Sequence, residues 1–309
     1  MPFGAPKTLS TSDGARIALY VQPAQGRPRA VVQINHGLAE HARRYARFAD
    51  FLAGKGFYVY AHDHRGHGAT RAPGAPRGSF GPSPAAETIV ADVLAVHGAI
   101  TADHPGLPVI LFGHSMGAQI ALNFLSAHPE RCAGAAIWNA PLATALEARA
   151  GKLVLAWERF RLGSDVPSRI MPHFTFSAWA RAIPNAATPF DWLSRDPEEV
   201  RKCVEDPDCG WLPTVGMWRD VFDFNLKIAA ADAFAQVPRT MPIQLVGGGA
   251  DPSTKGGAIM RRLEKRLRRE GFSNLETRIY EQARHETLNE INREEAMADF
   301  AGWAKKIAG

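Results

Sequence analysis

Residues 109–127 decide the fold and run Val-Ile-Leu-Phe-Gly-His-Ser-Met-Gly-Ala-Gln-Ile-Ala-Leu-Asn-Phe-Leu-Ser-Ala. The apolar start predicts a strand, and the residues from Ala118 onward are compatible with a helix. Between them, Gly113-His114-Ser115-Met116-Gly117 places a serine between two glycines. At so tight a strand-to-helix turn the serine backbone is strained, and the residues two positions away must be small. The stretch therefore predicts a nucleophile elbow with Ser115 as the nucleophile and His114 as a neighbour that supports the site.

Strands and helices alternate along most of the chain. Expected strands cover 16–21, 30–34, 57–60, 109–112, 135–138, 242–246 and 275–280. Expected helices cover 40–55, 87–102, 118–127, 256–270 and 292–306. This alternation predicts the α/β class, with a mostly parallel central sheet and helices on both of its faces.

The alternation stops between residues 141 and 220. This segment is rich in aromatic residues and proline, and its helices are expected to be short. We interpret it as an inserted helical cap over the carboxyl edge of the sheet, where ligands bind in open α/β folds. The expected division is a core of residues 1–140 and 221–309 and a cap of residues 141–220.

A serine nucleophile needs a histidine base, and the base needs a carboxylate to orient it. In the α/β-hydrolase fold the chain order is serine, acid, histidine, with the last two in loops that follow strands. Asp251 follows the strand expected at 242–246, and His285 follows the one at 275–280. We therefore expect Ser115, Asp251 and His285 to form a catalytic triad. Three reserve candidates for the acid do not directly follow an expected strand: Asp220, Asp223 and Asp232.

The oxyanion of such a reaction must be met by preorganised N–H groups. One donor is expected from Met116, which follows the nucleophile. The other is expected from Leu38, in the His36-Gly37-Leu38 loop after the strand at 30–34. His36 and Gly37 are then expected to support this loop.

Three histidines within six residues, His62, His64 and His67, raise the question of a metal site. Apart from Asp63 no carboxylate or cysteine stands beside them, so we expect a buried hydrogen-bond network behind the nucleophile and no metal. The chain has no dinucleotide-binding or phosphate-binding glycine motif, so no cofactor is expected.

Composition is ordinary for a globular enzyme, with 46% hydrophobic and 22% charged residues and a formal net charge of +5. The most basic stretch, residues 261–269, has apolar residues at helical spacing and predicts a surface helix with a basic face. No nucleic-acid partner is expected, and the alternative role for this helix is transient contact with a lipid surface. The oligomeric state stays open.

The N-terminal residues show no secretory pattern, and no apolar run is long enough to cross a bilayer. Three sparse cysteines (Cys132, Cys203 and Cys209) do not make a disulfide framework. These features predict a cytoplasmic location.

Several motifs together resemble the monoacylglycerol lipase and lysophospholipase branch of the α/β-hydrolases, which is grouped with serine aminopeptidase-like hydrolases. They are His36-Gly37-Leu38-Ala39-Glu40-His41 with Arg44-Tyr45, Asp63-His64-Arg65-Gly66-His67-Gly68, the stretch around Ser115, and Arg284-His285-Glu286 with Asn289-Glu290. The cap stretches 194–196 and 205–209 are also similar to the lipase cap. The resemblance implies the same triad, the same oxyanion donors and a long-chain acyl pocket under the cap. Between Ala143 and Ala187 the cap carries no motif of the branch, and this leaves the substrate open.

The leading hypothesis is a serine carboxylic ester hydrolase that forms an acyl-enzyme on a monoacylglycerol or lysophospholipid. The alternatives are a short-chain carboxylesterase, a serine aminopeptidase of the same fold, and a catalytically silent binding protein. An aminopeptidase needs acidic cap residues facing the site. The available ones are Glu198, Glu199 and Glu205.

Overall fold

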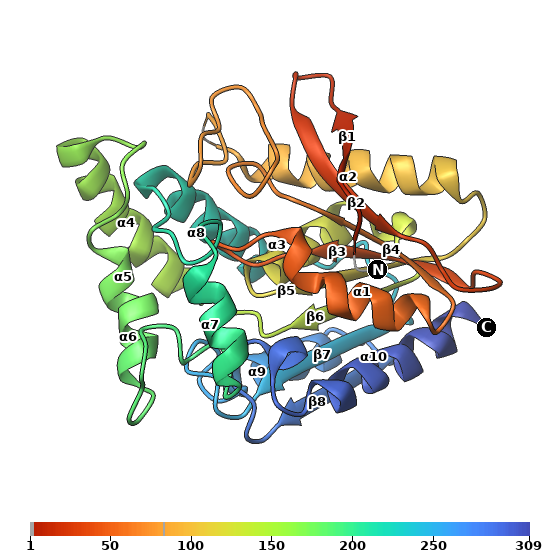
Figure 1. The fold of residues 1–309 in the computed structure, drawn as a ribbon. Coiled ribbons are helices and arrows are strands. Elements are labelled where there is room, and N and C mark those ends of the chain that lie inside the picture. The colour runs from red at the N-terminus through yellow and green to blue at the C-terminus, as the bar shows by residue number, and fades with distance from the viewer. Residues whose placement is uncertain (1–2, 83) are drawn as a thin grey trace.

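A computed structural model describes residues 3–82 and 84–309 and contains an eight-stranded sheet in the order β1-β2-β4-β3-β5-β6-β7-β8 (Figure 1). The strands are β1 (Lys7–Ser10), β2 (Arg16–Gln22), β3 (Ala30–Asn35), β4 (Phe57–His62), β5 (Val109–His114), β6 (Gly134–Trp138), β7 (Ile243–Gly248) and β8 (Leu275–Tyr280). β2 runs antiparallel to both of its neighbours, and the pairs from β4 to β8 are parallel. The prediction of a mostly parallel sheet is confirmed.

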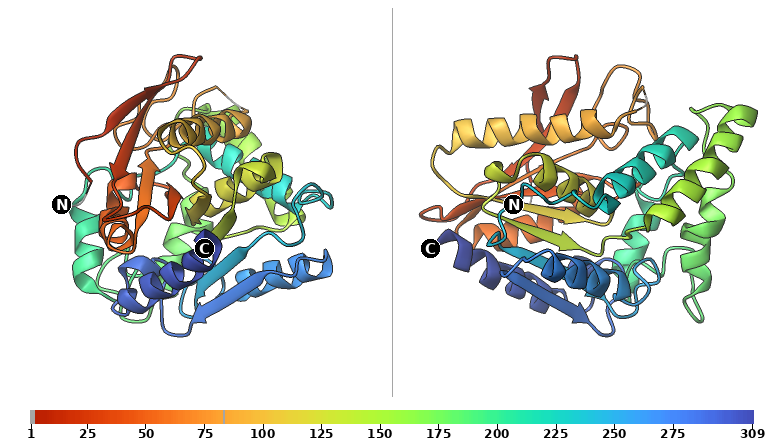
Figure 2. Two further views of the ribbon diagram at one scale, coloured as in Figure 1. Left: turned by 90° about the vertical axis from the view of Figure 1, so that its right-hand side faces the viewer. Right: turned by 180° about the vertical axis from the view of Figure 1, so that it is seen from behind.

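Helices cover both faces of this sheet (Figures 1 and 2). One face carries α1 (Ala46–Ala53) and α10 (Arg293–Ala308), whose apolar residues join one core cluster with β3, β4 and β5. The other face carries α2 (Ala86–Asp103), α3 (Met116–Ala127) and α9 (Ala258–Arg269), with α8 (Val215–Ala229) beside α3. Short 3-10 turns are η1 (Ala42–Tyr45), η2 (Pro129–Arg131) and η3 (Thr287–Asn289).

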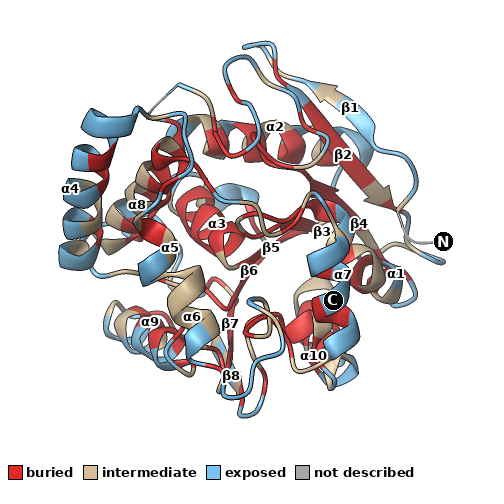
Figure 3. Ribbon diagram, turned by 60° about the vertical axis from the view of Figure 1, so that its left-hand side comes forward, coloured by how far each residue is buried: buried red, intermediate tan, exposed pale blue. Residues whose placement is uncertain are grey.

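Helices α9 and α3 differ in how much of their surface is buried. In α9 the apolar positions Ile259, Met260, Leu263 and Leu267 are buried, and the basic residues face outward as predicted. α3 is buried nearly all round, because it lies between the sheet and the helices α2 and α8 (Figure 3). A helix in such a place is apolar on every side. Its first turn, which follows Ser115, is therefore held rigidly.

Residues 141–220 contain α4 (Ala145–Leu162), α5 (Met171–Phe174), α6 (Phe176–Arg181) and α7 (Pro197–Glu205), which lie beyond one end of the strands (Figure 1). The expectation of short helices is wrong for α4, which has 18 residues. Thr144 and Glu147 form a capping box at its start, and α4 packs along α8. Its outer face exposes Leu146, Leu153 and Phe160, so its sequence lacks the clean apolar stripe that would have revealed it (Figure 3).

Some strand boundaries differ from expectation, and one strand was not expected. β4 continues to His62, so this histidine belongs to the strand and not to the following loop. β7 continues through Gly248, which shortens the loop that carries Asp251. β1 was not expected, because its four residues are mostly exposed and carry little apolar pattern. None of the helices in residues 3–82 and 84–309 combines the length and apolar character needed to cross a membrane.

Candidate active site

Ser115 occupies a strained turn between β5 and α3. Its backbone has φ 55° and ψ −120°, which a residue with a side chain rarely adopts. A Cβ on Gly113 would lie 2.3 Å from the Gly117 carbonyl oxygen, and one on Gly117 would lie 2.1 Å from that of Asn35. Both positions therefore require glycine. The Ser115 N–H donates to the Trp138 carbonyl at 2.9 Å, which ties the turn to β6. The structure thus shows the elbow geometry that the sequence predicts.

Asp251 and His285 meet behind the same edge of the sheet. Asp251 Oδ2 lies 3.0 Å from His285 Nδ1, and both side chains are buried. The carboxylate also accepts hydrogen bonds from the Thr254 hydroxyl at 2.8 Å and from the Ser253 N–H at 2.9 Å. Burial alone would raise the pKa of Asp251, but the neighbouring His285 and the side chains of Ser253 and Thr254 hold it below its usual value. Asp251 is therefore an ionised acceptor for the histidine.

One cavity brings the predicted residues together. Ser115 and His285 both border it, and so do Leu38 and Met116, whose N–H groups are the expected oxyanion donors. The loop after β3 comes so close to the nucleophile that a Cβ on Gly37 would lie 3.2 Å from the Ser115 Cβ. Only a glycine allows the backbone to approach in this way. The reserve acids lie elsewhere, since Asp220 and Asp223 are on α8 and Asp232 lies beyond its end.

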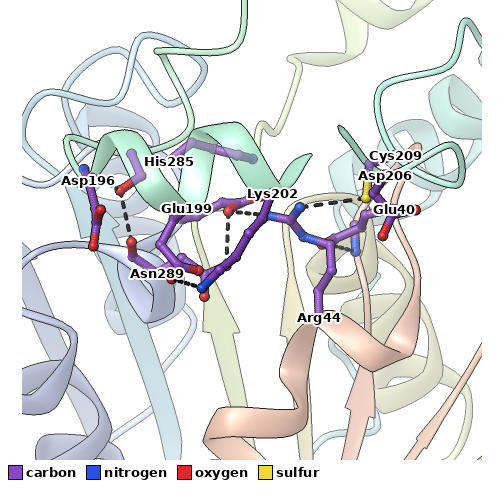
Figure 4. A network of polar contacts seen from close by, with 12 residues as sticks. Glu40, Arg44, Asp196, Glu199, Lys202, Asp206, Cys209, His285 and Asn289 are labelled. Carbon is purple, nitrogen blue, oxygen red and sulfur yellow. Dashed lines mark hydrogen bonds and ion pairs between the residues drawn. The ribbon is translucent and has the colours of Figure 1, made fainter. Parts of the chain in front are cut away.

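A buried ionic network supports this cavity, and its members stand in the motifs that carry the family resemblance. Glu40 accepts hydrogen bonds from the Tyr45 hydroxyl at 2.8 Å and from the Gly37 N–H at 2.5 Å. Arg44 contacts Glu40 at 3.2 Å and Glu286 at 2.5 Å (Figure 4). Burial alone would raise the pKa of Glu40, but His114 and Arg44 hold it well below its usual range. The ionised Glu40 therefore fixes the loop that holds Leu38.

His114 links this network to the candidate base. Its Nδ1 lies 3.5 Å from Glu40, and its Nε2 lies 3.0 Å from the carbonyl oxygen of His285. Burial alone would lower the pKa of His114, but the Glu40 carboxylate raises it overall. Both partners are acceptors, so the protonated imidazole suits the position best. The supporting role expected for His114 has this physical basis.

His62 at the end of β4 and the histidines of the following loop form a neutral cluster with His36. Ring centroids lie 4.4 Å apart for His36 and His64 and 4.7 Å apart for His62 and His64. Burial lowers the pKa of His36 to about 4 and those of His62 and His67 to about 3. His36 Nδ1 contacts the Gly37 carbonyl at 2.8 Å, and Nε2 accepts from the His64 N–H at 3.0 Å. The cluster thus braces the loop beside Ser115.

Among the described residues, one group of side chains could hold a metal ion. His41, Asp206 and Cys209 each offer a ligand atom, and these atoms lie within 4.8 Å of one another. His41 Nε2 already contacts Asp206 at 2.9 Å, and Arg44 donates to the Cys209 sulfur at 3.5 Å (Figure 4). These contacts give each of the three side chains a partner within the protein. They also join the loop that follows α7 to the core.

The strand order, the turn at Ser115 and the buried pair of Asp251 and His285 define an α/β-hydrolase of the serine type. The family model described as serine aminopeptidase, S33 (Hydrolase_4) matches residues 26–292, and the chain belongs to this family. It is an enzyme, a serine hydrolase of the lipase and esterase kind.

Individual relatives agree with this assignment. The chain is 28% identical to the human monoglyceride lipase over 94% of this chain and 86% of the relative. It is 29% identical to the monoacylglycerol lipase of Mycolicibacterium smegmatis over 94% and 93% of the two chains. The solved structure of a thermostable carboxyl esterase from Bacillus coagulans, in complex with glycerol, superposes with a TM-score of 0.89 at 24% identity over the full length of both chains. At that identity the likeness shows the fold.

Proposed function

We propose that the chain is a monoacylglycerol lipase or lysophospholipase-like carboxylic ester hydrolase that works through an acyl-enzyme. The observation that carries the proposal is the cavity that Ser115 and His285 share. Ser115 borders it at the elbow, and His285 borders it while its Nδ1 contacts Asp251. The names of the two sequence relatives favour monoacylglycerols as the substrate class.

In the proposed mechanism, Ser115 Oγ attacks the ester carbonyl carbon while His285 Nε2 takes its proton. Asp251 holds the imidazole tautomer and stabilises the imidazolium. The N–H groups of Leu38 and Met116 receive the oxyanion. The bond to the alcohol breaks as His285 returns the proton to it, and water then releases the fatty acid by the same steps.

The walls of the cavity favour an apolar acyl group. Its cap side carries Phe176, Trp179, Trp192 and Trp218. The cavity holds about 80 Å³, which is small beside the roughly 300–1,000 Å³ of typical ligand pockets. A second, mostly apolar hollow of about 540 Å³ lies under α4, and Trp179 and Trp218 border both. We propose that a long acyl chain passes between these two rings into the second hollow.

The aminopeptidase alternative lacks a free carboxylate at the site. Among the described residues that border the cavity, the acidic ones are Glu40 and Glu286, and Arg44 contacts both. Glu198 and Glu205 pair with Arg201 on the outside of α7. Glu199 pairs with Arg47 and Lys202. A substrate ammonium would have to displace one of these cations, so an ester is the better substrate.

Contact with a lipid surface is part of the proposal. α4 exposes Leu146, Leu153, Trp157 and Phe160 on the side away from the core, with exposed fractions between 53% and 90%. Arg149, Arg159 and Arg161 lie on the same helix. An apolar face flanked by cations suits the surface of an anionic lipid aggregate, from which such substrates are drawn. We also propose residues 141–220 as the cap domain that carries this face.

The test is hydrolysis of a chain-length series of monoacylglycerols beside matched p-nitrophenyl esters and an aminoacyl anilide. We expect turnover of long-chain monoacylglycerols, and we expect Ser115→Ala to abolish it. Turnover of short esters alone would leave a carboxylesterase, and turnover of the anilide would favour the aminopeptidase. If a fluorophosphonate failed to label Ser115, a silent binding protein would replace the enzyme proposal.

A further inference from the structure

His285 Nδ1 has two oxygen neighbours, and the closer one is not the carboxylate. Ser253 Oγ lies 2.8 Å from this nitrogen, whereas Asp251 Oδ2 lies 3.0 Å from it. Ser253 is only 6% exposed and sits in the turn between β7 and α9, two residues after Asp251. The sequence analysis gave this serine no role.

The ionised state of Asp251 decides the direction of both hydrogen bonds. A carboxylate can only accept, so Nδ1 must carry the proton. Because Nδ1 is then a donor, Ser253 Oγ must accept from it. This tautomer leaves Nε2 of the neutral ring without a proton, which is the state that a general base needs.

Asp251 Oδ2 also has more hydrogen-bond donors around it than one carboxylate oxygen can accept with good geometry. The Thr254 hydroxyl donates to it at 2.8 Å and the Asn139 amide at 3.2 Å, in addition to His285. One oxygen offers about two lone-pair sites. A second acceptor beside Nδ1 therefore keeps the histidine hydrogen bond satisfied although the carboxylate is shared.

We propose that Ser253 is a positioning residue for His285, whose Nδ1–H it shares with Asp251. The shared bond fixes the ring orientation and the tautomer from two sides. When the carboxylate is absent, Ser253 Oγ still accepts the hydrogen bond from Nδ1 and so still orients the ring in part. The inference rests on the proposed function, because it assumes that His285 is the base.

A double-mutant cycle measured on the full chain tests this role. We expect Ser253→Ala to lower kcat about fivefold with KM within twofold, because it removes one hydrogen bond of about 1 kcal/mol. Ser253→Thr keeps the hydroxyl and should restore most of the activity. In the Asp251→Ala background, Ser253→Ala should cost at least tenfold, because the last acceptor of Nδ1 is lost. An equal or smaller cost in that background would overturn the proposal.

The Nδ1 proton of His285 provides a spectroscopic readout that a purely structural serine would not move. Its NMR resonance should move downfield in Ser253→Ala, because the carboxylate becomes its only acceptor, and an unchanged resonance would contradict the sharing. Ser253→Gly serves as a second variant without the hydroxyl if the alanine variant does not fold. Ser273→Ala is the matched control, since this exposed serine bonds the Arg239 carbonyl far from the base. If Ser115→Ala and His285→Ala keep full activity, the proposed function fails, whereas inactive controls with an unaffected Ser253→Ala refute this inference alone.

Discussion

The two sides of the cavity are built on different principles. On the core side, Ser115, Asp251 and His285 stand in turns directly after parallel strands, and backbone atoms leave no room for change around them. On the cap side, the walls are aromatic rings from short helices and loops, and the outer face of α4 is exposed. The difference suggests that the rigid side carries the chemistry, while the cap selects the substrate.

Polar contacts join the two sides, and several of them reach the loop that carries His285. The N–H of Glu286 donates to the Leu193 carbonyl at 2.7 Å, and Arg195 contacts Glu290 at 2.8 Å. These contacts join the cap to the loop that carries His285. A change in the cap can therefore reach the base through this loop, and also directly, because the Trp192 ring lies 5.0 Å from that of His285.

The largest effect should come from the core side. Ser115→Ala should lower kcat/KM by about 10⁴-fold or more, because no other hydroxyl can replace a nucleophile at the elbow. Ester hydrolysis followed to full conversion measures this loss, and the melting temperature should stay close to that of the parent chain. Activity within tenfold of the parent would remove Ser115 from the mechanism.

The second effect concerns the tight packing of the elbow. In Gly117→Ala the new Cβ would meet the Asn35 carbonyl oxygen at 2.1 Å, and the backbone there cannot yield. We expect the free energy of unfolding in urea to fall by about 3 kcal/mol or more. Gly98→Ala is the control, since no atom lies within 4 Å of its Cβ in α2, and it should gain about 0.5–1 kcal/mol. Equal effects at the two glycines would disprove this view of the elbow.

The third effect tests the ionic network under the cavity. Glu40→Gln should cost about 2–3 kcal/mol of unfolding free energy at pH 7, because Arg44 and His114 lose a buried counter-charge. The pKa of Glu40 is depressed in the folded state, so its contribution is present above its unfolded pKa of about 4.3 and is lost as the pH falls below it.

Urea titrations at pH 6 and pH 3.5 measure that pH dependence. The parent chain should lose more stability between these two values than Glu40→Gln does, since the variant has no carboxylate to protonate. Parallel losses in both chains would mean that Glu40 is not ionised in the folded protein.

The smallest effect should come from the cap. Trp179 borders both hollows, so Trp179→Ala should change kcat/KM for long-chain monoacylglycerols severalfold and leave short p-nitrophenyl esters within about twofold. The chain-length series measures the ratio. A loss on short esters as large as on long ones would show that the cap acts on the chemistry and would break the comparison between the two sides.

Much of the core could be predicted from the sequence because its signals are local. The expected strands at 16–21, 30–34 and 275–280 agree with the observed strands to within one residue at each end. The elbow needs glycine at two fixed offsets, and the structure shows why in the contacts of Gly113 and Gly117. The roles of Ser115, Asp251 and His285 stay predictions, although Ser115 and His285 border one cavity and Asp251 contacts His285.

The cap and the supporting network could not be predicted in the same way. The length of α4 depends on its packing against α8, and its exposed apolar residues hide the helical period. Glu286 is far from Glu40 and Arg44 in the sequence, and each of the three alone resembles an ordinary surface charge. Only folding shows that they are buried and joined to one another.

The sequence by itself determined the sheet, the elbow and the order of serine, acid and histidine, because backbone sterics and hydrophobic periodicity act over a few residues. The tertiary structure decided which polar groups meet around His285. Ser253 and His114 contact His285 from two different segments, and Glu40 contacts His114 from a third. Such contacts depend on how the strands are ordered in space. The space between the Trp179 and Trp218 rings is decided in the same way, by how residues 141–220 pack over the core.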